Sequence, residues 1–317
     1  MTVLITGGAG FIGSHLAERL LERGERVVVI DDFNDFYNPL VKRANIRAVE
    51  SNPDYTLYEF DIRDRERVFE VFERERPGVV CHIAARAGVR PSIENPVLYE
   101  EVNCLGTLNM LEAAKGLALE NFVFASSSSV YGINSKVPFS EEDPITCPIS
   151  PYAATKRSGE LMCYTYSHLY DIPITCLRFF TVYGERGRPD MAVAKFTRLI
   201  HGGRPIPVYG DGTAQRDFTY ISDIIKGVVA SVYKPFKYEI INLGGSRTVD
   251  VKGLISIIEE KLGKKAEIEF LPAVPGDVPV TYADITKAQR LLAFKPEVGI
   301  VEGVERYIKW FLEGNFL

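Results

Sequence analysis

Residues 2–24, TVLITGGAGFIGSHLAERLLERG, begin with an apolar run of strand length, continue through a glycine-rich turn and end in a helical pattern. In that pattern Leu16, Leu20 and Leu21 share one face, and Gly24 stands where a helix leaves through the left-handed region. A strand, a tight turn and a helix in this order are typical of α/β units. The stretch therefore predicts the first strand and the first helix of an α/β fold.

The same alternation continues along the chain. Helical patterns separate most of the further strand-length apolar runs, which lie at residues 27–30, 55–60, 79–84, 122–125, 174–179 and 239–243. Continuous apolar strands are typical of a parallel sheet that is buried on both faces. We therefore predict a Rossmann-type doubly wound parallel sheet.

The turn between the first strand and the first helix predicts a dinucleotide site. Three glycines at GxxGxxG spacing let backbone N–H groups approach a pyrophosphate at the N-terminus of the helix. The alternative is a glycine turn that only packs the helix against the strand. The turn residues that we expect to contact the cofactor are Gly7, Gly10, Phe11, Ile12 and Gly13.

The end of the second strand, VVVIDDFN (residues 27–34), indicates which dinucleotide binds. Asp31 and Asp32 follow the glycines by about 20 residues, where a carboxylate holds a ribose 2′-hydroxyl. Two adjacent carboxylates repel a 2′-phosphate, so we expect NAD. Lys42 and Arg43 leave NADP as an alternative.

Residues at two later strand ends extend the expected cofactor site. Asp61 and Ile62 follow the third strand, and Asp61 either meets the adenine edge or caps a turn. Ala84 and Ala85 follow the fourth strand, where small side chains either let the cofactor pass close or serve tight packing. These strand ends complete the predicted cofactor site.

The chain is expected to divide into two domains. Residues 1–180 form the predicted NAD-binding domain, and residues 217–245 return to it. After about residue 180 the connections become rich in glycine and proline and the elements become shorter. Residues 181–317 are therefore expected to form most of a smaller C-terminal α/β substrate-binding domain.

The composition of the 317 residues argues against several classes of protein. A hydrophobic content of 46% and a charged content of 25% are those of an ordinary globular chain. A formal net charge of -5 argues against a nucleic-acid partner. Five widely spaced cysteines without CxxC pairing and four scattered histidines predict reduced thiols and no metal site. Without a basic leader or about 18 successive apolar residues, we expect a cytoplasmic protein with no membrane partner.

A serine cluster and a tyrosine–lysine pair indicate redox chemistry at an alcohol. ASSSSVYG (residues 125–132) ends an apolar run, and Tyr152 and Lys156 lie four residues apart on one face of a predicted helix. Oxidation of a carbinol needs a base at its oxygen. A neighbouring ammonium favours the phenolate of a tyrosine, whose free pKa is about 10. The alternative for Tyr152 and Lys156 is an exposed pair on a helix surface.

The motifs together resemble the extended short-chain dehydrogenase/reductase family, and within it the UDP-glucuronate 4-epimerases. The resemblance rests on TGGAGFIG, SSSSVYG and YAATK, extends through NDFYNPLVKRANI, AGVRPSIENP, RDFTYISDI and PGDVPVTYADITKA, and covers nearly the whole chain. It implies a tightly bound NAD and interconversion of UDP-glucuronate and UDP-galacturonate. The implied reaction is transient oxidation at C4, rotation of the 4-keto sugar and re-reduction.

The resemblance also assigns roles to residues of the serine cluster. Ser127 forms a catalytic triad with Tyr152 and Lys156, and Ser128 and Ser129 face the sugar. Related dehydratases carry an Asp-Glu pair in this loop, and decarboxylating members carry a Glu. The serines of this chain leave no acid for elimination and do not repel a substrate carboxylate.

The remaining substrate contacts, apart from Arg90, are implied in the second half of the chain. Thr181 and Arg188 are expected to hold the C5 carboxylate so that the 4-keto acid does not lose CO2. The residues implied for the diphosphate and uridine are Arg216 and Asp277, with Val208 and Tyr209 as a wall. Arg90 either approaches the substrate or lies on the surface, and Arg216 has an ion pair with Asp217 or Asp223 as its alternative.

Two helices within residues 94–115 and 152–170 carry apolar surface that predicts a four-helix homodimer contact. Two alternative functions remain open. A UDP-glucose/UDP-galactose 4-epimerase uses the same triad without a carboxylate clamp. A non-catalytic NAD-sensing regulator has no need of Tyr152 and Lys156.

Overall fold

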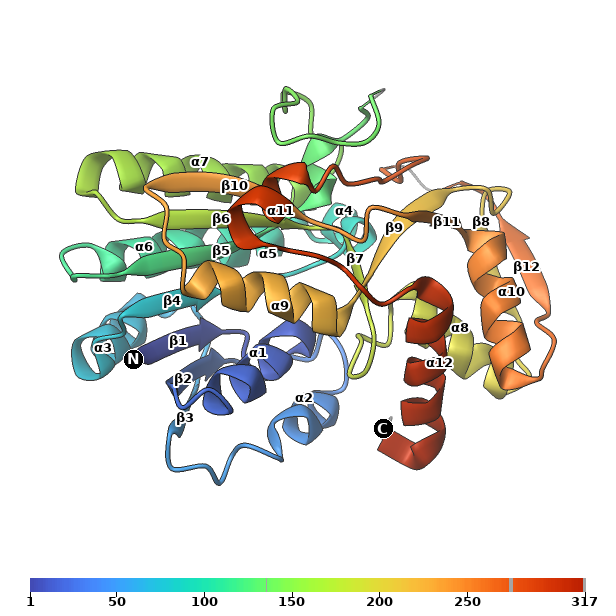
Figure 1. The fold of residues 1–317 in the computed structure, drawn as a ribbon, viewed down its shortest axis with the longest axis horizontal. Helices are drawn as coiled ribbons and strands as arrows, with labels where there is room; N and C mark the ends of the chain where they lie inside the picture. Colours follow the sequence, from blue (N-terminus) through green and yellow to red (C-terminus); the bar gives the residue numbers. More distant parts are fainter. Residues whose placement is uncertain (135, 274–275, 316–317) are drawn as a thin grey trace.

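Figure 1 shows the computed structural model of the chain, which describes residues 1–134, 136–273 and 276–315. Seven strands form one parallel sheet in the order β10-β6-β5-β4-β1-β2-β3. They are β1 (Thr2–Thr6), β2 (Arg26–Asp31), β3 (Tyr55–Glu59), β4 (Val79–His82), β5 (Asn121–Ser127), β6 (Ile174–Phe179) and β10 (Tyr238–Leu243). Each strand overlaps one of the apolar runs in the sequence. The predicted parallel sheet is therefore confirmed.

Helices cover both faces of the sheet because side chains alternate along each strand. Val3 and Ile5 belong to the core cluster that contains Leu16 of α1, whereas Leu4 between them packs in the cluster that contains Val71 of α3. Burial contributes about 1.5–3 kcal/mol for each such side chain. The elements around the sheet are α1 (Phe11–Leu21), α2 (Pro39–Ile46), α3 (Arg65–Glu75), α4 (Val89–Glu94), α5 (Pro96–Tyr99), η1 (Glu100–Leu105), α6 (Gly106–Ala114), η2 (Ser128–Tyr131), α7 (Pro151–Tyr170), α9 (Ile221–Val232) and α11 (Thr286–Leu292).

A second lobe lies beside the sheet, on the right of Figure 1. It has a three-stranded sheet, β11-β9-β7, and a two-stranded sheet, β12-β8. Its elements are β7 (Thr181–Tyr183), α8 (Ala192–His201), β8 (Ile206–Tyr209), β9 (Gln215–Tyr220), β11 (Thr248–Asp250), α10 (Val251–Leu262), β12 (Ile268–Leu271), α12 (Ile300–Trp310) and η3 (Phe311–Asn315). Pro275, which begins the PGDVP motif, lies outside the described residues.

The chain enters the second lobe, returns to the first and leaves it again. After β9, helix α9 packs against α1 and strand β10 pairs with β6 in the seven-stranded sheet. Strand β9 itself, at the start of the expected return over residues 217–245, pairs with β7 and β11 in the second lobe. The return to the large sheet therefore begins with α9.

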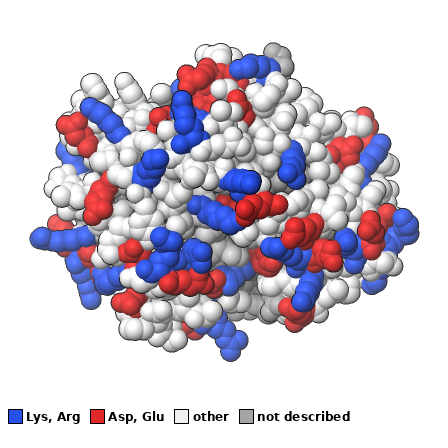
Figure 2. Space-filling view, viewed as in Figure 1, with Lys and Arg blue, Asp and Glu red and all other residues white. Residues whose placement is uncertain are grey.

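The molecular surface mixes charges of both signs. On the face shown in Figure 2, Lys and Arg side chains are interspersed with Asp and Glu side chains. Within the described ranges, no helix combines the length and apolar character that crossing a membrane requires. Among the same residues, no group of three or more His, Cys, Asp or Glu side chains is arranged to hold a metal ion.

Candidate active site

A pocket lies along the carboxyl ends of the parallel strands, where ligands bind in open α/β sheets. Its cavity has a volume of about 370 Å³. Every residue predicted for cofactor contact or catalysis lines it, together with four of the residues predicted for the sugar. These lining residues are Gly7, Gly10, Phe11, Ile12, Gly13, Asp31, Asp32, Asp61, Ile62, Ala84, Ala85, Ser127, Ser128, Ser129, Tyr152, Lys156, Thr181 and Arg188.

The glycine turn brings the N-terminus of α1 against the end of β1. Gly7 adopts a φ of +70°, which favours glycine, and a Cβ on Gly13 would collide with the carbonyl oxygen of Gly7. A Cβ on Gly10 would lie 3.2 Å from that same oxygen. The resulting open backbone at a helix N-terminus fits a pyrophosphate.

Two carboxylates and one lysine lie at the end of β2. The buried Asp31 accepts hydrogen bonds from the backbone N–H groups of Ala9, at 3.1 Å, and Phe33, at 3.0 Å. The Lys42 ammonium lies 3.0 Å from Asp31 Oδ1 and 3.5 Å from Asp32 Oδ1. Lys42 is therefore held by carboxylates, and Asp32, which is 26% exposed, is the more open of the two acids.

Asp61 makes contacts within its own turn as well as lining the pocket. Its Oδ1 accepts a hydrogen bond from the backbone N–H of Arg63 at 2.8 Å, and its Oδ2 pairs with the Arg63 guanidinium at 2.7 Å. Ala84 lies so close to the glycine turn that a Cβ on Gly7 would lie 2.9 Å from its nitrogen. Asp61 therefore caps its turn, and Ala84 packs tightly against the glycine turn, while both residues also line the pocket.

Helix α7 carries Tyr152 and Lys156 into the pocket. The helix begins after Ser150, whose Oγ accepts a hydrogen bond from the Ala153 N–H at 3.1 Å. Lys156 is buried and its Nζ donates to the carbonyl oxygen of Ala125 at 2.7 Å. Burial lowers the pKa of Lys156 to about 8.

The pKa of Tyr152 reflects opposing effects. Burial raises the pKa of the phenol, while hydrogen bonding by Ser127 and the charge of Arg188 act to lower it. The effect of burial is the largest, so the pKa of Tyr152 is raised overall, and Ser127 and Arg188 act against that rise. Lys156, to which the sequence pointed for favouring the phenolate, donates to the end of β5, next to the serines.

Arg188 lies at the same end of the pocket as Tyr152. Its guanidinium binds Asp190 through Nε at 3.0 Å and through Nη2 at 2.7 Å. Ser128, Ser129 and Thr181 line the same pocket. One guanidinium and three hydroxyls, with no carboxylate in the serine loop, are a set of donors suited to a carboxylate.

The five other residues predicted for substrate contact are not among those that line the pocket. Arg90 pairs with Asp277 at 2.8 Å and lies 3.8 Å from the centre of the Tyr209 ring. Val208, which precedes Tyr209, is buried, with 2% exposure. Burial lowers the pKa of Arg216, and the charge of Asp277 acts to raise it, so these two lie near each other. The cluster adjoins the pocket through Val89, which follows Gly88 and precedes Arg90.

The expected alternative for Arg216, an ion pair with Asp217 or Asp223, differs from the contacts that the structure describes. Arg216 Nη1 donates to the carbonyl oxygens of Gln215, at 2.9 Å, and Pro279, at 3.4 Å. Asp217 instead accepts from backbone N–H groups such as that of Gly245, at 2.6 Å. Asp223 accepts from the N–H groups of Glu297 and Val298.

Known proteins match this chain over nearly all of its length. The GDP-mannose 4,6 dehydratase family matches residues 4–307. The chain belongs to this family. The resemblance to extended short-chain dehydrogenases/reductases that the motifs indicated is thereby confirmed.

Individual members of the family are similar over their full length. A UDP-glucuronate 4-epimerase of Thermodesulfobacterium geofontis is 45% identical over 311 residues, which cover 98% of this chain and 96% of the relative. The crystal structure of Bacillus cereus UDP-glucuronic acid 4-epimerase with UDP-glucuronic acid and NAD has a TM-score of 0.94 at 39% identity, and 99% of each chain is covered. The structure of Thermotoga maritima UDP-glucose 4-epimerase with UDP-glucose has a TM-score of 0.91 at 33% identity, again over 99% of each chain.

Several further residues line the pocket that no sequence motif pointed to as site residues. They include Asn34, Phe36, Tyr37, Arg86, Gly88, Val102, Phe179 and Met191. Phe36 and Tyr37 belong to the NDFYN segment that carried part of the family resemblance, so that motif was the available signal.

Asn103, in the π-helical turn η1, is a further residue without an earlier assignment. Its Oδ1 accepts from the Arg86 N–H at 2.8 Å, and its Nδ2 donates to the Arg86 carbonyl and to Thr155 Oγ1, both at 3.0 Å. It therefore joins a wall of the pocket to α7. The signal in the sequence is a polar residue within an apolar helical pattern, because a buried amide needs partners.

Proposed function

We propose that this chain is an NAD-dependent epimerase that interconverts UDP-glucuronate and UDP-galacturonate at C4 of the sugar. The observation that carries the proposal is a pocket lined by Tyr152, Ser127 and Arg188, with serines where dehydratases of the family carry acids. The 45% identity to a UDP-glucuronate 4-epimerase and the fold shared with a relative that binds UDP-glucuronic acid and NAD support it.

The cofactor is held along the carboxyl edge of the sheet. The glycine turn binds the pyrophosphate, and Asp32, the more exposed of the two acids, accepts from the ribose hydroxyls. Bound NAD supplies reversible hydride transfer at C4 of the sugar. Residues 1–180, with the return that begins at α9 and continues through β10, make up the cofactor-binding domain, and most of 181–317 binds the UDP-sugar.

Tyr152 acts as the base on the C4 hydroxyl. Its phenolate takes the hydroxyl proton as the carbon is oxidised, and it returns that proton when the turned sugar is reduced. Ser127 hydrogen-bonds the same substrate oxygen, and its hydrogen bond to Tyr152 acts to lower the pKa of the phenol against the larger effect of burial. Lys156, fixed to Ala125, keeps a positive charge beside the reacting atoms.

Arg188 and Thr181 hold the sugar carboxylate. Oxidation at C4 makes a β-keto acid, which loses CO2 when the bond to the carboxylate aligns with the carbonyl π system. Charge-assisted hydrogen bonds from Arg188, Thr181, Ser128 and Ser129 hold the carboxylate away from that alignment. Arg90 and Arg216, with Asp277 and Tyr209 beside them, bind the diphosphate and uridine. The nucleotide therefore stays anchored while the sugar turns.

We also infer that the enzyme works in the cytoplasm as a homodimer. All five cysteines are free thiols and four of them are buried, as in a reducing compartment. Exposed apolar side chains on α5, η1 and α7 support the dimer, because such residues are expected to be covered.

Incubation with single UDP-sugars tests the function. NMR should follow the conversion of UDP-glucuronate and UDP-galacturonate into each other, with UDP-glucose and UDP-N-acetylglucosamine turned over far more slowly. Tyr152→Phe should lower kcat by about 10²–10⁴-fold. The matched control is Tyr233→Phe, since Tyr233 and Lys237 have the same spacing but Tyr233 lies on the surface, bonded to Glu25 at 2.7 Å.

Two other outcomes decide between the alternatives. Conversion of UDP-glucose alone would favour the neutral-sugar epimerase, whose relative from Thermotoga maritima has the same fold. Inertness toward all four sugars, with NAD still bound, would favour the regulator.

A further inference from the structure

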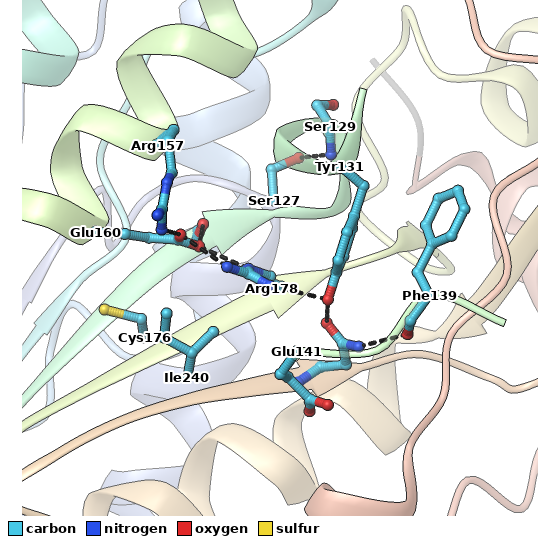
Figure 3. Close-up of polar contacts among 12 residues, drawn as sticks. Ser127, Ser129, Tyr131, Phe139, Glu141, Arg157, Glu160, Cys176, Arg178 and Ile240 are labelled. Carbon is cyan, nitrogen blue, oxygen red and sulfur yellow. Dashed lines mark hydrogen bonds and ion pairs between the residues drawn. The ribbon is translucent and has the colours of Figure 1, made fainter. Parts of the chain in front are cut away.

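A buried ion pair lies behind the serine cluster, on the side of β5 that faces α7 (Figure 3). Glu160 is one turn after Lys156 on α7, and Arg178 is on β6; their side chains are 0% and 1% exposed. Arg178 binds the carboxylate with two hydrogen bonds, from Nε at 2.8 Å and from Nη2 at 2.9 Å. Arg157 adds a third at 2.8 Å. The carboxylate is thereby fixed in orientation.

Glu160 attaches α7 to the end of β5 immediately before Ser127. Ser126 Oγ donates to Glu160 Oε1 at 2.6 Å. One residue earlier, the Ala125 carbonyl receives the hydrogen bond from Lys156. Two successive residues of β5 are thus tied to the helix that carries Tyr152.

Arg178 attaches the network to the chain that follows Ser127. Its Nη1 donates to the hydroxyl of Tyr131, the last residue of η2, at 2.9 Å. Tyr131 in turn donates to Asn242 Oδ1 on β10 at 2.7 Å, and Asn242 Nδ2 donates to the Phe139 carbonyl at 2.9 Å. Figure 3 shows this chain of contacts leading from Glu160 through Arg178 to Phe139. The ion pair therefore holds Ser126, which precedes Ser127, and Tyr131, which follows Ser129 by two residues.

A buried ion pair contributes little net stability, because the cost of removing two charges from water offsets their attraction. The ion pair therefore matters more for the fixed positions of the residues that it contacts than for stability. We propose that Glu160 and Arg178, acting through Ser126 and Tyr131, are positioning residues that hold the Ser127 hydroxyl in register with Tyr152. The inference rests on the proposed function only for its kinetic consequences.

Direct removal of Glu160 or Arg178 is a poor test, because it leaves an unpaired buried charge and can prevent folding. Ser126→Ala and Tyr131→Phe keep the ion pair and each remove one attachment. We expect either variant to lower kcat about tenfold, since small displacements of reacting groups have effects of this size. KM for UDP-glucuronate should stay within about twofold, because the nucleotide is bound elsewhere.

The pH dependence separates positioning from a loss of stability. The base must be ionised, so kcat rises with pH through the pKa of Tyr152. When Ser127 is less well aligned it favours the phenolate less, so the rising limb of the kcat profile should move to higher pH. Carbon-13 NMR of ring-labelled tyrosine, assigned with Tyr152→Phe, should show the same upward change in the NAD-loaded protein without any turnover.

Ser231→Ala is the matched control, because Ser231 is a buried serine whose Oγ donates to the Val228 carbonyl at 2.7 Å within α9. It should leave the kcat profile and the Tyr152 resonance unchanged. Variants S126A and Y131F with a wild-type pKa of Tyr152 would overturn the inference, even if they unfold at a lower temperature. If the Tyr152 pKa is higher in both variants than in the wild type, but the wild type turns over no UDP-sugar, positioning is supported and the proposed function is overturned.

Discussion

Arg188 illustrates how one side chain can serve two purposes. It binds Asp190 with two hydrogen bonds, and its charge acts to lower the pKa of Tyr152, which burial raises overall. Asp190 therefore fixes the orientation of the guanidinium within the pocket. A pre-oriented cation of this kind costs less entropy when it binds a carboxylate.

Arg188→Ala and Thr181→Ala should change the products more than the rate of substrate consumption. With the carboxylate free to rotate, more of the 4-keto acid should lose CO2, so the ratio of UDP-pentose to epimer should rise. NMR of the product mixture measures this ratio. Arg204→Ala, which removes an exposed arginine from the second lobe, is the control. A ratio equal to that of the wild type in both pocket variants would exclude the clamp.

Lys156 leads to a prediction about stability in protein freed of nucleotide. Its pKa falls to about 8 in the folded chain, against about 10.4 in an unfolded one. Between these values the unfolded chain binds the additional proton, so stability should rise with pH, by about 1.4 kcal/mol per pH unit at most. Denaturant unfolding of wild type and Lys156→Met from pH 7 to about pH 10 gives the difference. A difference that stays constant or falls with pH would contradict the prediction.

At the scale of single elements, α7 presents side chains to three different surroundings. It carries Tyr152 and Lys156 toward the pocket, Glu160 toward β6 and exposed apolar side chains toward solvent. Gly159 lets the helix approach β5 closely, because a Cβ there would collide with the ring of Phe124.

Gly159→Ala should therefore lower stability although alanine favours helices. Helix propensity would stabilise the variant by about 1 kcal/mol. Overpacking against an aromatic ring costs about 1–3 kcal/mol, and a direct collision belongs at the upper end. We expect a net loss of about 1–2 kcal/mol in denaturant unfolding, with a lower kcat because Tyr152 moves relative to Ser127. Thr165→Ala on the exposed face of α7 should show no loss, and an equally stable G159A would show that β5 can yield.

The elements differ in how far sequence could predict them. The strands of the large sheet are marked by local apolar runs, and the glycine turn and the acids after β2 have fixed spacings. The contacts of Tyr131 with Arg178 and Asn242 join residues that are 47 and 111 positions apart, so no local pattern indicates them. Likewise, the pairing of β9 with β7 and β11 depends on the path of the whole chain. Arg90, Tyr209 and Asp277 were identified one by one, and only the fold brings them together.

At the scale of the whole molecule, an apolar stripe on α5, η1 and α7 predicts the mode of assembly. The stripe consists of Val97, Leu105, Leu161 and Tyr164, which are 66%, 47%, 52% and 54% exposed. Tyr164 follows Leu161 by three residues, which places these two side chains on one face of α7, and η1 packs against α7. Single apolar residues on a surface are ordinary, but a continuous stripe is expected to be covered.

Leu161→Glu combined with Tyr164→Glu should convert a dimer into a monomer, because two charges would be buried in the contact. Light scattering after size-exclusion chromatography measures the mass. Val301→Glu, at a similarly exposed position on α12, should leave the mass unchanged. A wild-type protein of monomer mass would refute this mode of assembly.

The path of the chain between the lobes limits how the molecule can be recombined. Strand β10, which forms an edge of the large sheet, follows β7, β8 and β9 of the second lobe in the sequence. It also supplies Asn242, which contacts Tyr131 beside the serine cluster. A chimaera with one junction near residue 180 would import a foreign β10 into a native sheet. Grafting a new sugar preference from a homologue therefore calls for two separate donor segments, one on each side of α9 and β10, while those two elements stay with the recipient.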